Sequence, residues 1–281
     1  MSSSSYATIS ALSILENPRK ASPRTTVFDS LIFIGSPSLE KIQGSLRYYA
    51  EDDAAYPDAA LYYIVFSVAK MEKGIKVFTD DAAEQAEYNF VGDIKTITLI
   101  TACDTTAFTE IDVAQRAYVN VCGAVTRSDT NAATFTLDAE QYTSAFAEQA
   151  KHAAETGTVF TAKSVFPVIG FFPDSPRYKN KKPVPWVKRF VSFGGYLSGV
   201  SAALEGETLF ERFRVEVDNI AFLGTYTPLA STPTSTAAAS GSGGASSSKR
   251  PRFSYTQKRR RNDNDDTNGG APTSSPSPST F

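Results

Sequence analysis

The chain has 281 residues, of which 41% are hydrophobic and 21% charged, an ordinary composition for one large globular domain or two small ones with tails. It has no apolar run of about 18 residues and no signal-peptide pattern at its N-terminus, so we expect an intracellular protein without a transmembrane helix. The net charge of −2 hides an asymmetry: residues 1–230 carry −6 (21 Lys/Arg, 27 Asp/Glu) and residues 231–281 carry +4 (7 Lys/Arg, 3 Asp). A basic tail on an acidic body is typical of an interaction tail.

The N-terminal half is dominated by β-branched and aromatic runs. Residues 1–24 are Ser-rich and weakly patterned, so we expect a flexible N-terminal arm. Strand patterns follow at residues 26–35, 45–50, 60–70, 73–81 and, after a helix-like start at residue 82, from Val91 to Ile100; residues 73–81 are expected to pair with residues 60–70. Residues 25–112 are therefore predicted to form a β-rich N-terminal lobe.

The C-terminal half has strand patterns around one clear helix. The strands are expected at residues 113–126, 134–137, 158–172, 187–202 and 211–224, with a Pro-rich loop at residues 173–185. The helix is expected over residues 138–156, with Asp138 as its N-cap and Gly157 as its C-cap. From Ser231 onward the chain lacks large apolar residues almost entirely, so residues 231–281 are predicted to be disordered.

The order of elements from residue 113 to 224 is strand, strand, helix, strand, long loop, strand, strand. The first strand contains a central glycine (Gly123), and the last two read YLSGV and FRVEVDNIAFLG. This pattern resembles the OB-fold, the five-stranded Greek-key barrel of single-stranded nucleic-acid-binding proteins such as replication protein A. The family usually places its helix between the third and fourth strands, whereas here it lies between the second and third. The resemblance implies an OB-like barrel over residues 113–230 that binds single strands in a basic groove floored by aromatic residues. The β-rich half before it is either a second small barrel or an extension of one sheet.

One segment of the acidic body, residues 177–190, combines positive charge with aromatic rings and contains no acidic residue. Cations bind phosphates and aromatic faces stack on bases, so this loop is the candidate nucleic-acid site. The candidate residues are Arg177, Tyr178, Lys179, Lys181, Lys182, Trp186, Lys188 and Arg189. The alternative is a solvated Pro-rich loop whose Trp186 and Phe190 enter the core, because tryptophan is usually well buried. Arg212 and Arg214 either extend the basic surface or are ordinary solvated strand positions.

The tail contains two short basic clusters that match the K-[KR]-x-[KR] pattern of nuclear import signals. Their basic residues are Lys249, Arg250, Arg252, Lys258, Arg259, Arg260 and Arg261. Import receptors bind flexible, extended basic segments, so we expect an import receptor as partner and a nuclear location. The alternative is a solvated basic patch, or one that binds nucleic acid without specificity.

Signs of catalysis and of cofactor binding are lacking. The sequence contains no nucleophile elbow, phosphate-binding loop, zinc-protease motif or dinucleotide fingerprint. Two cysteines and one histidine are too few for the common structural zinc sites. We therefore expect no enzyme, no cofactor and no metal. Two functions remain open: a nuclear single-stranded nucleic-acid-binding protein, DNA before RNA, or a nuclear protein-interaction module without nucleic acid.

Overall fold

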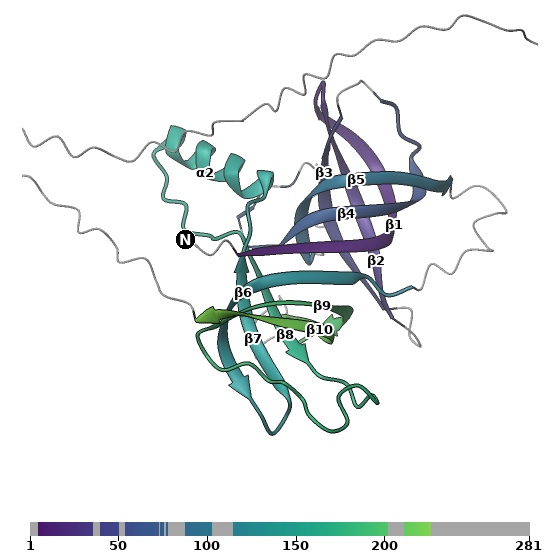
Figure 1. Cartoon of the computed structure of the whole chain (residues 1–281). Coiled ribbons are helices and arrows are strands. Elements are labelled where there is room, and N and C mark those ends of the chain that lie inside the picture. The colour runs from purple at the N-terminus through teal and green to yellow at the C-terminus, as the bar shows by residue number, and fades with distance from the viewer. Residues whose placement is uncertain are drawn as a thin grey trace, which may run out of the picture. The chain divides into compact units, whose positions relative to one another are not determined.

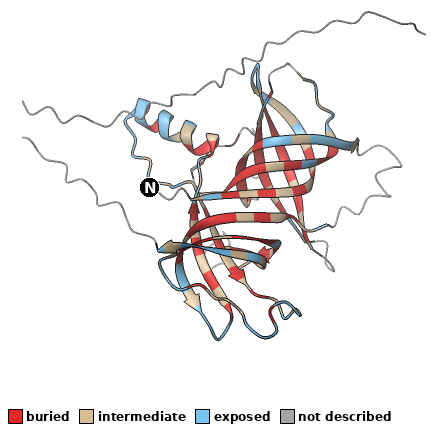
Figure 2. Ribbon diagram, in the orientation of Figure 1, coloured by how far each residue is buried: buried red, intermediate tan, exposed pale blue. Residues whose placement is uncertain are grey.

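The computed structural model describes residues 5–35, 40–50, 54–72, 74, 75, 77, 88–102, 115–201 and 211–225. Within these residues the chain forms ten strands and one helix, which confirms a mainly β fold with a single helix. Buried and exposed residues alternate along most strands (Figure 2), as expected when one face of each strand lines a core.

The first five strands close a barrel. They are β1 (Tyr6–Ser22), β2 (Thr25–Gly35), β3 (Glu40–Tyr49), β4 (Ala59–Lys70) and β5 (Phe90–Ala102). Hydrogen bonds connect them in the order β1-β2-β3-β5-β4 and back to β1, with β3 and β5 parallel and the other pairs antiparallel. This connectivity is that of an OB-like Greek-key barrel.

The remaining elements close a second barrel of the same connectivity. They are β6 (Tyr118–Asp129), β7 (Thr134–Glu140), α2 (Ser144–Thr156), β8 (Val165–Phe171), β9 (Arg189–Val200) and β10 (Phe213–Thr225). The order is β6-β7-β8-β10-β9 and back to β6, with β8 and β10 parallel. The OB-like architecture is confirmed, and the N-terminal half is a second barrel (Figure 1).

The largest departure from the sequence-based expectation is at the N-terminus. The sequence predicts a flexible arm there, but residues 6–22 form β1, a strand of 17 residues. Its residues alternate between buried and partly exposed from Tyr6 to Leu15, with Ile9 completely buried. This alternation is hard to see in the sequence, because the partly exposed positions include Thr8 and Ser10, whose small polar side chains are also common in unstructured segments.

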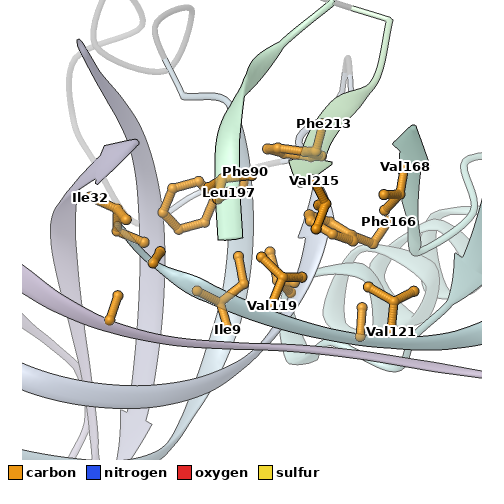
Figure 3. Close-up of a cluster of buried hydrophobic side chains, with 14 of the residues drawn as sticks. Ile9, Ile32, Phe90, Val119, Val121, Phe166, Val168, Leu197, Phe213 and Val215 are labelled. Atoms are coloured by element: carbon orange, nitrogen blue, oxygen red, sulfur yellow. The ribbon is translucent and has the colours of Figure 1, made fainter. Parts of the chain in front are cut away.

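β1 also joins the two barrels. Its first residues pair with β6, where Tyr6 lies opposite Cys122 and Ser10 opposite Tyr118. The buried apolar side chains of both barrels form one continuous cluster, from Ile9, Ile32 and Phe90 to Val119, Phe166 and Phe213 (Figure 3). The two barrels therefore share their core and belong to one compact unit.

Helix α2 begins later than the sequence predicts. Residues 138–140 continue β7, where Asp138 lies opposite Pro167, so Asp138 does not cap the helix. The N-cap is Thr143, and the backbone N–H of Ser144 donates to Asp93 Oδ2 of β5 at 2.8 Å. Gly157 ends the helix in the left-handed conformation at φ 70°, as expected for a C-cap glycine.

α2 lies in the sequence of the second barrel but packs on the first. Its Phe146 and Ala145 are buried with Met71, Tyr88 and Val91 in a small second core. An ion pair between Arg47 of β3 and Glu148 of α2 adds a polar contact. The helix lies between the second and third strands of the second barrel, as the sequence predicts. It covers the first barrel rather than the barrel to which it belongs in sequence.

Two smaller expectations need correction. The sequence predicts that residues 73–81 pair with β4, but β4 pairs with β1 and β5. Residues 73, 76 and 78–81 of that segment lie outside the described residues. A glycine inside a strand, such as Gly123 in β6, often marks a bulge or a sharp bend. The register shift of β6 against β7 lies between Val125 and Arg127 instead, so the bulge is not at Gly123.

Asp29 of β2 is the centre of a buried polar network in the first barrel. Its carboxylate accepts hydrogen bonds from Tyr88 Oη at 2.5 Å, from Arg19 Nη1 at 2.8 Å and from Asn17 Nδ2 at 2.9 Å. Burial acts to raise the pKa of Asp29, but the bonds from Arg19, Tyr88 and Asn17 outweigh it and hold the pKa below its ordinary value. The register of β1 against β2 shifts between Glu16 and Arg19, and the network links this irregular part of β1 to β2 and to the segment that precedes β5.

The substitution Asp29→Asn tests this network. Because it leaves Arg19 without its buried counter-ion, we expect the free energy of unfolding to fall by about 3 kcal/mol in urea titrations at pH 7. A group whose pKa is lowered on folding stabilises the protein above its unfolded pKa, so the difference between wild type and variant should shrink as the pH falls below about 4. A difference that stays constant from pH 7 to pH 3 would contradict this account.

Candidate nucleic-acid interface

The connection between β8 and β9 carries the predicted site and is anchored to the second barrel by Tyr178. This side chain is only 6% exposed and packs edge-to-face on Phe172, with ring centroids 4.9 Å apart. Burial raises the pKa of Tyr178, and its hydroxyl donates to the Asp218 carbonyl of β10 at 2.6 Å. Tyr178 is therefore an anchor for the loop and is not available to stack on a base.

The loop ends in a tight turn that holds Trp186 in solvent. The Arg189 backbone N–H donates to the Trp186 carbonyl at 3.0 Å, and the Lys188 N–H donates to Val125 of β6 at 2.8 Å. Lys188 has a φ of 66°, a left-handed conformation that costs a non-glycine residue free energy. The turn leaves Trp186 78% exposed, so the alternative in which it enters the core is wrong for Trp186, whereas Phe190 is buried as that alternative expects.

A groove lies between this loop and the end of β10. Its volume is about 420 Å³, and it is lined by Lys181, Lys182, Pro183, Val184, Pro185, Trp186, Arg189 and Phe222. None of these lining residues is acidic. Phe222 is 44% exposed, so two large aromatic side chains meet solvent at one groove. A space of this size can take a small organic ligand or a single nucleoside.

Arg189 lies against Phe222 in this groove. Its guanidinium carbon is 5.7 Å from the centroid of the Phe222 ring, within the range of a cation–π contact. Its Nε atom is shielded from solvent and has no hydrogen-bond partner within the described part of the chain. Neighbouring β-strands hold both residues, because Thr225 and Arg189 pair across β10 and β9.

The other positively charged side chains of the loop differ in whether an acidic side chain lies beside them. Arg177 pairs with Asp218 at 3.2 Å, and Lys182 with the exposed Asp174 at 2.5 Å. The bond from Lys182 holds the pKa of Asp174 below its ordinary value. Lys179 and Lys181 are exposed. Surface pairs such as these are weak, so Lys182 remains able to exchange its carboxylate for a phosphate.

The structure thus brings together half of the predicted residues. Lys181, Lys182, Trp186 and Arg189 line one groove; Lys188 shapes the turn beside it; Arg177 and Tyr178 attach the loop to Asp218. Phe222 was missed, because it is 33 residues from Arg189 in sequence and reads as an ordinary strand residue. The basic clusters at Lys249–Arg252 and Lys258–Arg261 lie outside the described residues.

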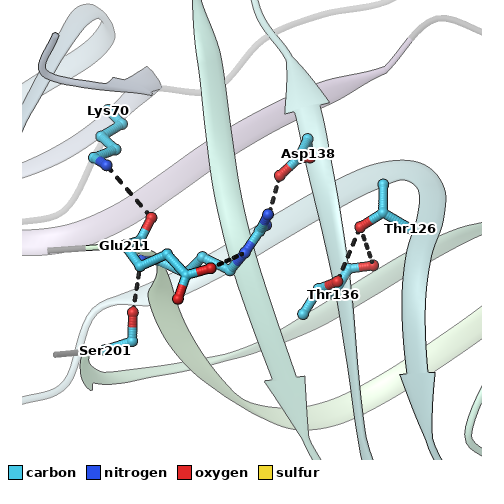
Figure 4. A network of polar contacts seen from close by, with 7 residues as sticks. Lys70, Thr126, Thr136, Asp138, Ser201 and Glu211 are labelled. Atoms are coloured by element: carbon cyan, nitrogen blue, oxygen red, sulfur yellow. Dashed lines mark hydrogen bonds and ion pairs between the residues drawn. The ribbon is translucent and has the colours of Figure 1, made fainter. Parts of the chain in front are cut away.

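Arg212 and Arg214 differ in how they contribute to the surface: Arg212 is paired with acidic residues, whereas Arg214 is exposed. Arg212 Nη1 binds Asp138 Oδ1 at 2.5 Å and its Nε lies 3.5 Å from Glu211, while its backbone N–H donates to Ser201 (Figure 4). In the same network Lys70 Nζ donates to the Glu211 carbonyl at 3.4 Å, which links β4 to the start of β10. The guanidinium of Arg214 lies over the Phe171 ring. Arg212 is therefore neutralised within the barrel surface, and Arg214 is an exposed strand residue that keeps its positive charge.

Features of other classes of site are sparse in the described part of the chain. There, no group of three or more His, Cys, Asp and Glu residues could hold a metal ion. His152 is exposed on α2, and Cys122 is a buried free thiol. No helix among the described residues is long and apolar enough to cross a membrane.

Comparison with known proteins gives distant structural similarity alone. No protein-family model and no curated protein matches the chain. Among solved structures, a deletion mutant of the single-stranded DNA binding protein from Thermus aquaticus is similar, with a TM-score of 0.36 and 10% sequence identity over 81% of this chain and 98% of that one. At this level, the similarity assigns neither a family nor a function to the chain.

The turn beside the groove can be tested through Lys188. Glycine adopts a positive φ without steric cost, so Lys188→Gly should be more stable than Lys188→Ala by about 1 kcal/mol in urea titrations. The two variants lose the same charge, and the alanine variant is therefore the matched control. Equal stability of the two, or a more stable alanine variant, would show that the turn is not strained.

Proposed function

We propose that this protein binds single-stranded nucleic acid through the groove between the β8–β9 loop and β10, and that its function is binding rather than catalysis. The observation that carries the proposal is the exposure of Trp186 and Phe222 on a groove lined by cations and free of acidic residues. Exposed tryptophan is unusual, and here a strained turn maintains it.

The groove supplies both components of single-strand binding. Aromatic faces stack on bases of any sequence, and lysine and arginine side chains neutralise phosphates. The acidic net charge of residues 1–230 is compatible with this, because at physiological salt charges further than about 8 Å away are largely screened. Local charge at the groove therefore decides the sign of the interaction.

DNA is proposed as the preferred strand. The side chains that line the groove are lysine, proline, valine, tryptophan, arginine and phenylalanine, none of which offers an acceptor for a ribose 2′-hydroxyl. The 2′-hydroxyl is the group by which proteins select RNA, and at this groove its proton finds no side-chain acceptor, although its oxygen can accept a hydrogen bond from a lysine or arginine.

Substitution of Trp186 by alanine tests the proposal directly. Loss of one stacked base costs about 1–3 kcal/mol, so we expect the dissociation constant of the full chain for a labelled single strand of about 15 nucleotides to rise about tenfold or more. Fluorescence anisotropy with single-stranded DNA, single-stranded RNA and duplex DNA measures the effect.

The matched control is Tyr142→Ala, which removes an aromatic residue that is 71% exposed but lies outside the groove. Lys181→Ala should make the dependence of binding on salt shallower, whereas Lys95→Ala, an exposed lysine on the first barrel, should not. Equal losses in Trp186→Ala and Tyr142→Ala would contradict the proposal. Salt-independent binding of a protein partner, with no single-strand binding, would favour an interaction module instead.

We further propose a nuclear location, directed by the basic clusters of the tail. Replacing Lys249, Arg250, Arg252 and Lys258–Arg261 by glutamine should move a tandem fluorescent-protein fusion from the nucleus to the cytoplasm, because the import receptor loses its charged partners. Fluorescence microscopy of living cells measures the distribution. Replacement of Asp263, Asp265 and Asp266 by asparagine is the control, and nuclear accumulation without the basic clusters would overturn the proposal.

A further inference from the structure

One edge of β5 is open over the second half of the strand. β5 pairs with β4 along its whole length, from Phe90 to Ala102, but with β3 only from Phe90 to Ile94. From Lys95 to Ile100, no described residue pairs with the edge that faces away from β4. The backbone N–H and C=O groups of an open edge are a template for pairing with another strand.

This edge lacks most of the features by which proteins protect an open edge. The segment reads KTITLI, with Lys95 as its one charged residue and with no proline. Its threonines and isoleucines are β-branched and favour strand pairing. Leu99 is 55% exposed and Ile100 is 44% exposed, so two aliphatic side chains in succession meet solvent. Register shifts against β4 lie at Lys95 and at Ile100, but the four residues between them pair regularly with β4.

The equivalent strand of the second barrel is covered by its own chain. β10 also extends past its parallel neighbour β8, with which it pairs only from Phe213 to Glu216. There the connection between β8 and β9 lies beside the strand, and Tyr178 Oη donates to the Asp218 carbonyl at 2.6 Å. The corresponding connection of the first barrel, between β3 and β4, is shorter, and its described residues make no backbone hydrogen bond with β5.

We infer that the open edge of β5 pairs with the same edge of a second copy of this chain, so that the protein forms a symmetric dimer through a continuous sheet. The inference is independent of nucleic-acid binding, because the proposed groove is on the second barrel. A second copy supplies a strand that is already extended, so pairing does not require a flexible segment to become ordered. Antiparallel pairing about a two-fold axis also closes the assembly at two copies.

A two-fold axis at Thr98 makes this edge complementary to itself. Antiparallel pairing about this axis places the exposed Leu99 opposite the half-buried Ile97 of the second copy, so apolar side chains meet. It also places Thr98 opposite Thr98, a favourable cross-strand pair. The two Lys95 side chains lie three residues to either side of the axis, about 20 Å apart, where their repulsion is screened.

The interface is small, since each copy contributes one strand edge and the exposed side chains of Leu99 and Ile100. Interfaces of this size are typical of weak, reversible association. We therefore expect a dissociation constant of about 10 µM for the dimer.

Sedimentation velocity of the full chain between about 1 and 200 µM measures this association. Thr98→Glu places two carboxylates directly opposite each other, and Thr98→Lys places two ammonium groups there. Because like charges at such a pair are destabilising, each variant alone should raise the dissociation constant at least about tenfold. An equimolar mixture of the two variants should associate at least as tightly as the wild type, since opposite charges then face each other.

The matched control is Thr130→Glu, which adds the same charge at an exposed turn between β6 and β7 and should dimerise as the wild type does. Thr98 is exposed, so its variants should fold, and circular dichroism checks this. A wild-type chain that stays monomeric over the whole concentration range overturns the inference without any variant. A dimer that persists in both Thr98 variants, or a mixture of them that does not associate, also overturns it. Loss of the dimer in each variant and its recovery in the mixture support pairing at Thr98.

Discussion

The structure depends on β1, because this strand forms hydrogen bonds with three others. It pairs with β4 from Thr8 to Glu16 and with β2 from Ser13 to Ser22, which closes the first barrel. Residues 6–10 also pair with β6, so the same strand attaches the second barrel. The second barrel in turn contributes α2, whose Phe146 is buried against the first. Each barrel thus contributes an element that packs on or pairs with the other, and the two barrels share the hydrophobic core beneath the groove's strands.

The two barrels have the same connectivity but different chemistry at equivalent loops. In the second barrel, the connection between its third and fourth strands contains the basic and aromatic residues of the groove. The corresponding connection of the first barrel, between β3 and β4, reads AEDDAAYPD and is acidic by sequence. Of these two connections, the one in the second barrel has the composition that suits an anionic ligand. The first barrel is hydrogen-bonded to the second through β1, and α2 of the second barrel packs on the first.

Much of this fold follows from the sequence, because residues such as Phe213, Val215 and Val217 alternate with polar residues as a half-buried strand requires. β1 was missed because serine and threonine occupy several of its partly exposed positions, and such a strand looks like an unstructured arm until its partners are known. The helix start was misplaced because Asp138 is a good N-cap in isolation, whereas pairing of β7 with β8 continues to Glu140.

The loop at 177–190 was identified from composition, but only the tertiary structure separates Tyr178 in the core from Trp186 in solvent. Phe222 and the unpaired Nε of Arg189 have no sequence signature, since both depend on the approach of β10 to the turn.

The central claim, that single strands occupy this groove, is tested most directly by photo-crosslinking. The full chain is irradiated with single-stranded DNA that carries 5-iodouracil at successive positions, and the attached peptides are identified by mass spectrometry. The account predicts crosslinks at Trp186 or Phe222, the aromatic residues exposed at the groove. Crosslinks confined to the basic tail, or to exposed tyrosines of the first barrel such as Tyr49 and Tyr63, would contradict it.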